Sequence, residues 1–183
     1  MLCRVGRRGA VKTPNKTIIS LYTEEERRRR DTTSWTLVQG VLAPIQFLVF
    51  LISLALVIRY LTTGQGYFVA TASIVVKTAV LYTIMITGSI WEKVVFGRYL
   101  FARAFFWEDV FSMLVLALHT AYLGALWTGF LDAWGQMILA LAAYLAYVIN
   151  ATQFVLKLRA ARLQEQANRD AAAASKTDME FAR

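Results

Sequence analysis

The chain has 183 residues, a formal net charge of +8, 57% hydrophobic residues and a mean hydropathy of +0.47. This composition excludes an ordinary soluble domain and favours an integral membrane protein in contact with the lipid bilayer. The basic residues lie mainly in the tails, so nucleic acid is not an expected partner. The lone cysteine, Cys3, permits no internal disulfide.

The N-terminal tail, residues 1–34, is basic and polar. Thr23 and Glu26 form a capping-box pattern at the start of "TEEERRRR", and the Glu and Arg residues that follow can pair along the helix. We therefore expect a short cytosolic or interfacial helix there, preceded by disorder over residues 1–20.

Four apolar runs are long enough to cross a bilayer as helices. They cover residues 35–60, 67–91, 110–127 and 134–156, and most of their ends carry Trp or Tyr, as in the aromatic belts of membrane proteins. None shows the strict alternation of a strand. Residues 35–156 are therefore expected to form the membrane domain of an all-α integral membrane protein, a bundle of four transmembrane helices, and residues 157–183 a C-terminal tail.

The distribution of Lys and Arg predicts the orientation. Eighteen of the 20 lie in the two tails and in the loop between the second and third spans, whereas Arg59 alone lies on the other side and Lys77 lies within a span. The positive-inside rule then places both termini and the middle loop in the cytoplasm.

Polar and ionisable side chains inside spans are expensive and are hypotheses for functional sites. Lys77 and His119 fall near the midpoints of their spans, and two carboxylates, Glu108 and Asp109, open the third span. The remaining members of this set are Gln46 in the first span, Glu92 at the end of the second, and Asn150 in the fourth.

Helical geometry relates several of these residues. Glu108 and His119 are eleven residues apart, which places them on one face of a helix, separated by about 16 Å in depth. Together the polar groups suggest a shared cavity, open to the cytoplasmic face, that suits a flat amphiphile. Structural alternatives stay open, because Lys77 and His119 can be satisfied inside a bundle and the acids can favour a helix N-terminus.

Motifs for redox, nucleotide or nucleophilic-serine chemistry are absent from the sequence, which has no HExxH, CxxC, Gly-rich phosphate loop or GxSxG. A single histidine cannot supply two axial haem ligands. Acid–base chemistry or binding remains, with no cofactor expected.

Long stretches of the chain resemble a known family. "SWTLVQGVLAPIQFLVFLISLALVIRYL", "GSIWEKVVFGRYLFA", "FFWEDVFSMLVLALHTAYL" and "YVINATQFVLKLRAARL" are similar to the vinyl hydratases of bacteriochlorophyll synthesis, over residues 21–163. The resemblance implies a hydro-lyase of the inner or intracytoplasmic membrane. It would add water to the 3-vinyl group of chlorophyllide a or bacteriochlorophyllide, giving the 3-(1-hydroxyethyl) pigment. Other enzymes of pigment synthesis are implied as possible partners.

The chemistry of vinyl hydration suggests roles for the polar residues. Glu108 or Asp109 is expected to act as the general acid, with Glu92 as a second carboxylate that orients water. His119 is expected to be an axial ligand of the pigment magnesium, or else the base for water. The other expected substrate contacts are Lys77 to a ring substituent, Lys93 to the propionate, Trp107 by stacking, and Gln46 and Asn150 as cavity lining.

Two other classes remain open from the residues alone. A non-catalytic tetrapyrrole carrier or assembly factor would bind pigment through His119 without converting it. A small transporter would use Lys77 and the acids as a proton relay.

Overall fold

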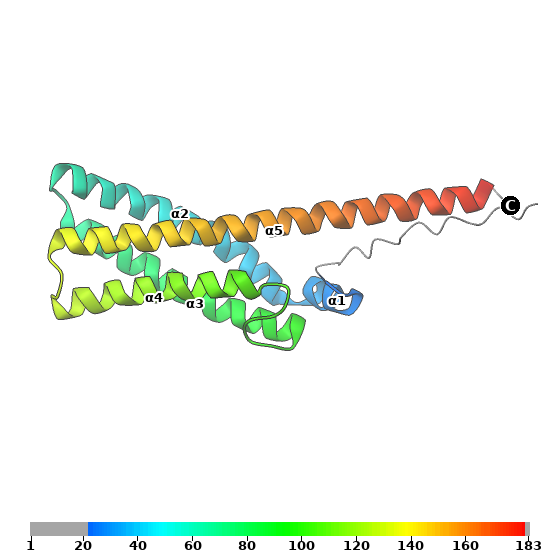
Figure 1. Ribbon diagram of the computed structural model, residues 1–183, viewed down its shortest axis with the longest axis horizontal. Helices are drawn as coiled ribbons and strands as arrows, with labels where there is room; N and C mark the ends of the chain where they lie inside the picture. Colours follow the sequence, from blue (N-terminus) through cyan, green and yellow to red (C-terminus); the bar gives the residue numbers. More distant parts are fainter. Residues whose placement is uncertain (1–21, 182–183) are drawn as a thin grey trace, which may run out of the picture.

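The computed structural model describes residues 22–181, and these residues form five helices (Figure 1). Four of the helices are long and apolar enough to cross a membrane, which confirms the expected all-helical, four-span class. The expectation of disorder for residues 1–20 lies outside the described residues. The helices are α1 (Glu24–Thr32), α2 (Ser34–Thr63), α3 (Tyr67–Phe96), α4 (Phe106–Thr128) and α5 (Ala133–Phe181).

Local signals explain where the helices begin and end. Thr23 caps α1 through the capping box with Glu26 that the sequence predicts. The helices α2, α3 and α4 each end at a glycine in the left-handed region, with φ of 70° at Gly64, 78° at Gly97 and 65° at Gly129. Other residues adopt this conformation at a cost, so the glycines terminate the helices sharply.

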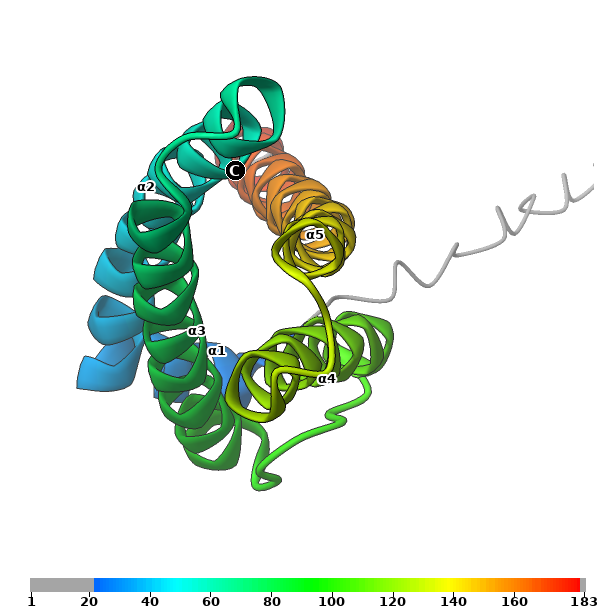
Figure 2. The same ribbon diagram turned by 90° about the vertical axis from the view of Figure 1, so that its left-hand side faces the viewer.

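The four long helices form two antiparallel hairpins around a common axis (Figure 2). The helix α2 packs chiefly against α3, and α4 against α5, while smaller contacts join α2 to α5 and α3 to α4. Apolar and aromatic side chains fill the middle of the bundle, among them Val57, Ile74, Val115, Tyr122 and Tyr144. The two hairpins are thus more tightly packed within themselves than against each other.

The last helix continues well beyond the bundle. Figure 1 shows the distal half of α5 projecting past the other spans on the side where α1 lies. From Gln136 to Phe181 the sequence has no Gly or Pro, so no local signal ends the helix at Leu156, where the apolar run stops. Glu165 of α5 contacts Arg30 of α1 at 3.3 Å and Arg27 at 3.5 Å, which ties the two elements together.

An aromatic cluster anchors the segment before α1 to the same end of the bundle. Tyr22 stacks on Phe96 with ring centroids 5.7 Å apart, and Trp91 meets Phe105 edge-on at 5.8 Å. Burial raises the pKa of the Tyr22 hydroxyl, and the Arg30 guanidinium above its ring acts in the opposite direction. The N-terminal helix is therefore an integral part of this end of the fold.

Candidate active site

Three buried carboxyl groups gather where α3 ends and α4 begins. We call Glu92, Glu108 and Asp109 the carboxylate cluster; all three are less than one-tenth exposed. The side chains of Glu92 and Asp109 lie next to each other, close enough for the two carboxyl groups to interact directly. Since a hydrogen bond between two carboxyl groups needs a proton on one of them, this pair is suited to hold a transferable proton.

The same two carboxylates also hold the loop between α3 and α4. Asp109 Oδ2 accepts a hydrogen bond from the Phe101 backbone N–H at 2.7 Å, and Glu92 Oε2 accepts one from the Ala102 N–H at 3.4 Å. Phe101 has a φ of 59°, a left-handed conformation that is unfavourable for a bulky residue. Glu92 and Asp109 thus stabilise the fold of this loop, in addition to any role in catalysis.

The third acid joins α4 to α5. Glu108 Oε2 accepts from Lys157 Nζ at 2.7 Å, and one turn further along Ser112 accepts from the Asn150 amide at 2.9 Å. Glu108, Ser112 and His119 are all buried on the inner face of α4, and the spacing of Glu108 and His119 predicts their shared face. Glu108 is therefore tied to α5 by an ion pair with Lys157.

A second group of polar side chains lies in the middle of the bundle. Gln46 of α2, Lys77 of α3 and His119 of α4, which we call the interior cluster, are between 0% and 2% exposed. Within residues 22–181, Lys77 Nζ and both amide atoms of Gln46 have no hydrogen-bond partner. Buried polar atoms are normally paired, so this cluster indicates a place for ligand atoms.

The hydrogen bonding of His119 defines its available atom. Its Nδ1 lies 2.8 Å from the Val115 carbonyl oxygen, whereas Nε2 has no partner in the described part of the chain. A carbonyl only accepts, so Nδ1 carries the proton and Nε2 keeps its lone pair. This tautomer suits either a metal ligand or a general base.

Aromatic residues that the sequence reasoning missed enclose Lys77. Its Nζ lies 4.1 Å from the centre of the Tyr147 ring and 5.5 Å from that of Tyr144, at distances typical of cation–π contacts. The Tyr144 hydroxyl bonds Ser53 at 2.5 Å, and Ser53 bonds Ser73 at 2.7 Å. The spacing of Tyr144 and Tyr147 on a buried helix face is the sequence signal that was available.

The remaining expected residues lie apart from both clusters or have local partners. Trp107 is 68% exposed on the outer surface, which fits the aromatic-belt alternative. Lys93 Nζ donates to the Gly97 carbonyl at 3.0 Å and lies 5.2 Å from the Tyr99 ring centre. Among residues 22–181 there is no group of three or more His, Cys, Asp or Glu side chains arranged to hold a metal ion.

These features define a four-span helical membrane protein whose buried groups suit acid–base chemistry or ligand binding. Residues 22–160 match the family model described as 2-vinyl bacteriochlorophyllide hydratase, so the chain belongs to that family, as the resemblance of its stretches indicates. No solved structure matches the chain.

Two relatives show how much of the chain is shared. The 2-vinyl bacteriochlorophyllide hydratase of Cereibacter sphaeroides is 70% identical over 148 residues, which cover 80% of this chain and 91% of the relative. The protein of the same name from Rhodobacter capsulatus is 70% identical over 145 residues, covering 79% of this chain and 84% of the relative. The likeness therefore spans the whole helical bundle.

Proposed function

We propose that this chain is a hydro-lyase that adds water to the 3-vinyl group of chlorophyllide a or bacteriochlorophyllide, giving the 3-(1-hydroxyethyl) derivative. The observation that carries this proposal is the family match over residues 22–160, together with relatives of the same name at 70% identity. The buried carboxylate cluster supplies groups suited to the reaction.

The reaction needs a proton, a water molecule and a base. A general acid protonates the terminal vinyl carbon, and the π bond becomes a C–H bond and a cation at the inner carbon. The macrocycle delocalises that cation. Water then forms the new C–O bond at the inner carbon, and a base takes the extra proton, which restores the acid over the cycle. No redox step is involved.

We assign the acid to the carboxylate cluster. Glu108 and Asp109 are both candidates, with Glu92 as the second carboxylate that orients water. Of these two candidates Asp109 is preferred, because it lies next to another carboxyl group, that of Glu92, whereas Glu108 is paired with Lys157. Glu108, paired with Lys157 at 2.7 Å, is then the anion that stabilises the developing cation.

The interior cluster is proposed to hold the part of the pigment that lies away from the 3-vinyl group. Glu108 and His119 are eleven residues apart on α4, or about 16 Å along its axis, so the two clusters contact different parts of one ring that stands along the bundle. His119 Nε2 is the proposed ligand for the pigment magnesium, and Lys77 the donor to a ring substituent. Gln46 and Asn150 remain proposed lining residues, Lys93 the partner of the propionate, and Trp107 a stacking residue.

We also propose that both termini and the α3–α4 loop face the cytoplasm, from an inner or intracytoplasmic membrane. The ion pairs between α1 and α5 support this orientation, because they join the described parts of the two tails at one end of the bundle. Within residues 22–181, twelve of the 14 Lys and Arg residues belong to these parts, to the end of α3 or to the loop after it. Residues 1–34 and 157–183 then act as cytoplasmic tails around a membrane domain of residues 35–156. The exposed distal part of α5 is the proposed surface for other pigment-synthesis enzymes.

Single substitutions test the acid–base assignment. Glu92→Gln, Glu108→Gln and Asp109→Asn are made separately and assayed for chlorophyllide a hydration, with the exposed Glu25→Gln of α1 as control. At least one of the three is expected to lower turnover strongly while Glu25→Gln does not. Normal turnover in all three would contradict the assignment.

A pigment carrier is the second candidate function. The unpaired His119 Nε2 in the interior favours it, because a ligand atom without a nearby acid can bind a pigment without converting it. A carrier would keep its pigment affinity in all three carboxylate variants and would produce no hydrated pigment.

A further inference from the structure

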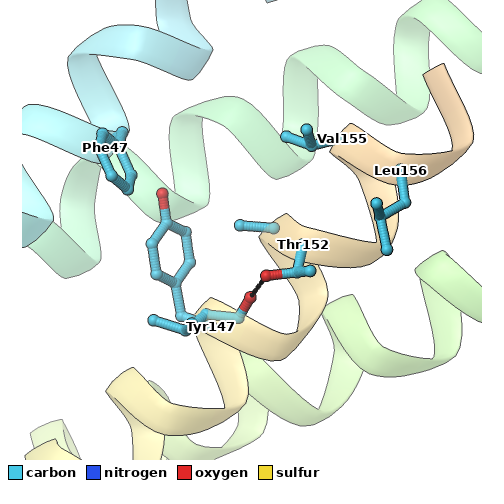
Figure 3. Close-up of a pocket in the computed structure, with 7 residues that line it drawn as sticks. Phe47, Tyr147, Thr152, Val155 and Leu156 are labelled. Atoms are coloured by element: carbon cyan, nitrogen blue, oxygen red, sulfur yellow. Dashed lines mark hydrogen bonds between the residues drawn. The ribbon is translucent and has the colours of Figure 1, made fainter. Parts of the chain in front are cut away.

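A groove opens between α2 and α5 on the outside of the bundle (Figure 3). Its volume is about 230 Å³. We call it the α2–α5 groove; it is lined by Phe47 of α2 and by Tyr147, Val148, Ala151, Thr152, Val155 and Leu156 of α5.

The outer side of the groove is apolar and faces the surroundings of the bundle. Phe47 is 50% exposed and Leu156 is 60% exposed, and both belong to helices long and apolar enough to span the membrane. The one hydroxyl-bearing aliphatic residue, Thr152, turns its hydroxyl back to the Val148 carbonyl at 2.8 Å. The groove is therefore open to lipid and offers apolar contacts.

The most buried residue of the groove lining is Tyr147, which is 8% exposed. Tyr147 lines the groove, with its hydroxyl directed toward Phe47 in Figure 3. The ring of the same residue is 4.1 Å from Lys77 Nζ. Tyr147 thus lies between the groove and the fully buried Lys77 Nζ, which has no hydrogen-bond partner within residues 22–181.

The packing around the groove permits movement of the Tyr147 side chain. The helices α2 and α5 belong to different hairpins and touch each other much less than α2 touches α3. A change of the Tyr147 rotamer breaks its ring contact with Phe50 of α2, 4.9 Å between centroids, which lies across this looser pair of helices. It requires the loss of cation–π contact with Lys77, which a ligand acceptor would replace.

We propose that the α2–α5 groove is the port through which the pigment passes from the lipid into the bundle, with Tyr147 as the gate in front of Lys77. This inference rests on the proposed hydratase function. The pigment is a flat apolar ring with oxygen-bearing substituents, so its edge suits the groove and its oxygens suit the Lys77 ammonium. An acyl chain of a lipid matches the groove wall but offers nothing to Lys77.

Substitutions that fill the groove test whether it serves pigment entry or the hydration reaction. Ala151→Phe places a ring in the groove, and Val155→Trp does so from a residue that is 63% exposed, where a larger side chain disturbs no core. Ala142→Phe is the matched control, since Ala142 is an exposed alanine of α5 outside the groove lining. Each variant is placed in lipid nanodiscs and supplied with chlorophyllide a.

We expect the groove variants to slow entry of the pigment without changing the reaction step. Both groove variants lower kcat/KM by about tenfold, with kcat within about twofold of the unsubstituted protein, and Ala142→Phe changes neither. Unchanged kcat/KM in both groove variants would overturn the port. So would a fall in kcat at unchanged KM, because the substitution would then act on the reaction itself.

A binding measurement separates this inference from the proposed function. The association rate of chlorophyllide a is followed by quenching of tryptophan fluorescence. If the unsubstituted chain binds but does not hydrate, a tenfold slower association in Ala151→Phe still supports the port while the hydratase function fails. If it hydrates and association is equal in all variants, the function stands and the port fails. Loss of a bound lipid from Ala151→Phe, with pigment association unchanged, would mark the groove as a lipid site and overturn the port.

Discussion

Two substitutions of Asp109, by Asn and by Ala, separate its role in the reaction from its role in stability. In the unsubstituted chain the Phe101 N–H donates to Asp109 Oδ2 at 2.7 Å. Asp109→Asn keeps an oxygen that can accept this hydrogen bond, and its NH₂ group can donate to Glu92. Asp109→Ala removes both contacts. The asparagine variant therefore loses only the proton that the Glu92 and Asp109 carboxyl groups share.

The magnitudes follow from these contacts. Loss of a positioned general acid lowers turnover by about 100- to 10,000-fold. Loss of a hydrogen bond to a charged acceptor costs roughly 1.5–3 kcal/mol. Releasing Phe101 from its left-handed backbone conformation offsets about 1 kcal/mol of this loss in stability. We therefore expect Asp109→Ala to be destabilised by about 0.5–2 kcal/mol relative to Asp109→Asn.

The assay pairs turnover of chlorophyllide a with denaturant unfolding in the same detergent. Both variants should lose turnover to the same extent, and only Asp109→Ala should lose stability; Glu25→Gln is the control for a carboxylate on the exposed face of α1. The reasoning is refuted if Asp109→Asn keeps normal turnover. It is also refuted if Asp109→Asn is inactive only because it unfolds as readily as the alanine variant.

Further substitutions probe the remaining contacts. Lys157→Met leaves the buried Glu108 without its partner at 2.7 Å and should lower stability by about 2 kcal/mol in denaturant unfolding; adding Glu108→Gln should recover part of the loss, and no recovery would contradict the ion pair. His119→Phe should weaken chlorophyllide a binding by about tenfold or more in an absorption titration if Nε2 is a magnesium ligand, whereas a change confined to turnover would indicate proton transfer. Tyr22→Ala should speed hydrogen exchange in α1 while the membrane helices keep their protection, and unchanged exchange in α1 would show that the aromatic cluster does not hold it.

Hydropathy was sufficient to predict the fold class but not the ends of its helices. The third apolar run begins at Val110, whereas α4 begins at Phe106 and its first turn contains Glu108 and Asp109. An apolar run stops at a charge, but helical hydrogen bonding continues through charged residues that find partners. For the same reason α5 continues past Leu156.

Periodicity predicted contacts within one helix, and tertiary packing determined the others. The shared face of Glu108 and His119 follows from 3.6 residues per turn. The contact between Glu92 and Asp109 depends on how the loop containing Phe101 folds back onto both carboxylates. The position of Tyr147 against Lys77 depends on the register between α5 and α3, which no local pattern encodes.

Conversion of pigment by the purified chain tests the central claim most directly. Chlorophyllide a is incubated with the protein in nanodiscs, and the product is followed by mass and by absorption. The account predicts a gain of one water and a shift of the red band to shorter wavelength, as the vinyl group leaves conjugation. Tight binding of chlorophyllide a with no change in mass would contradict the account and make the chain a pigment carrier.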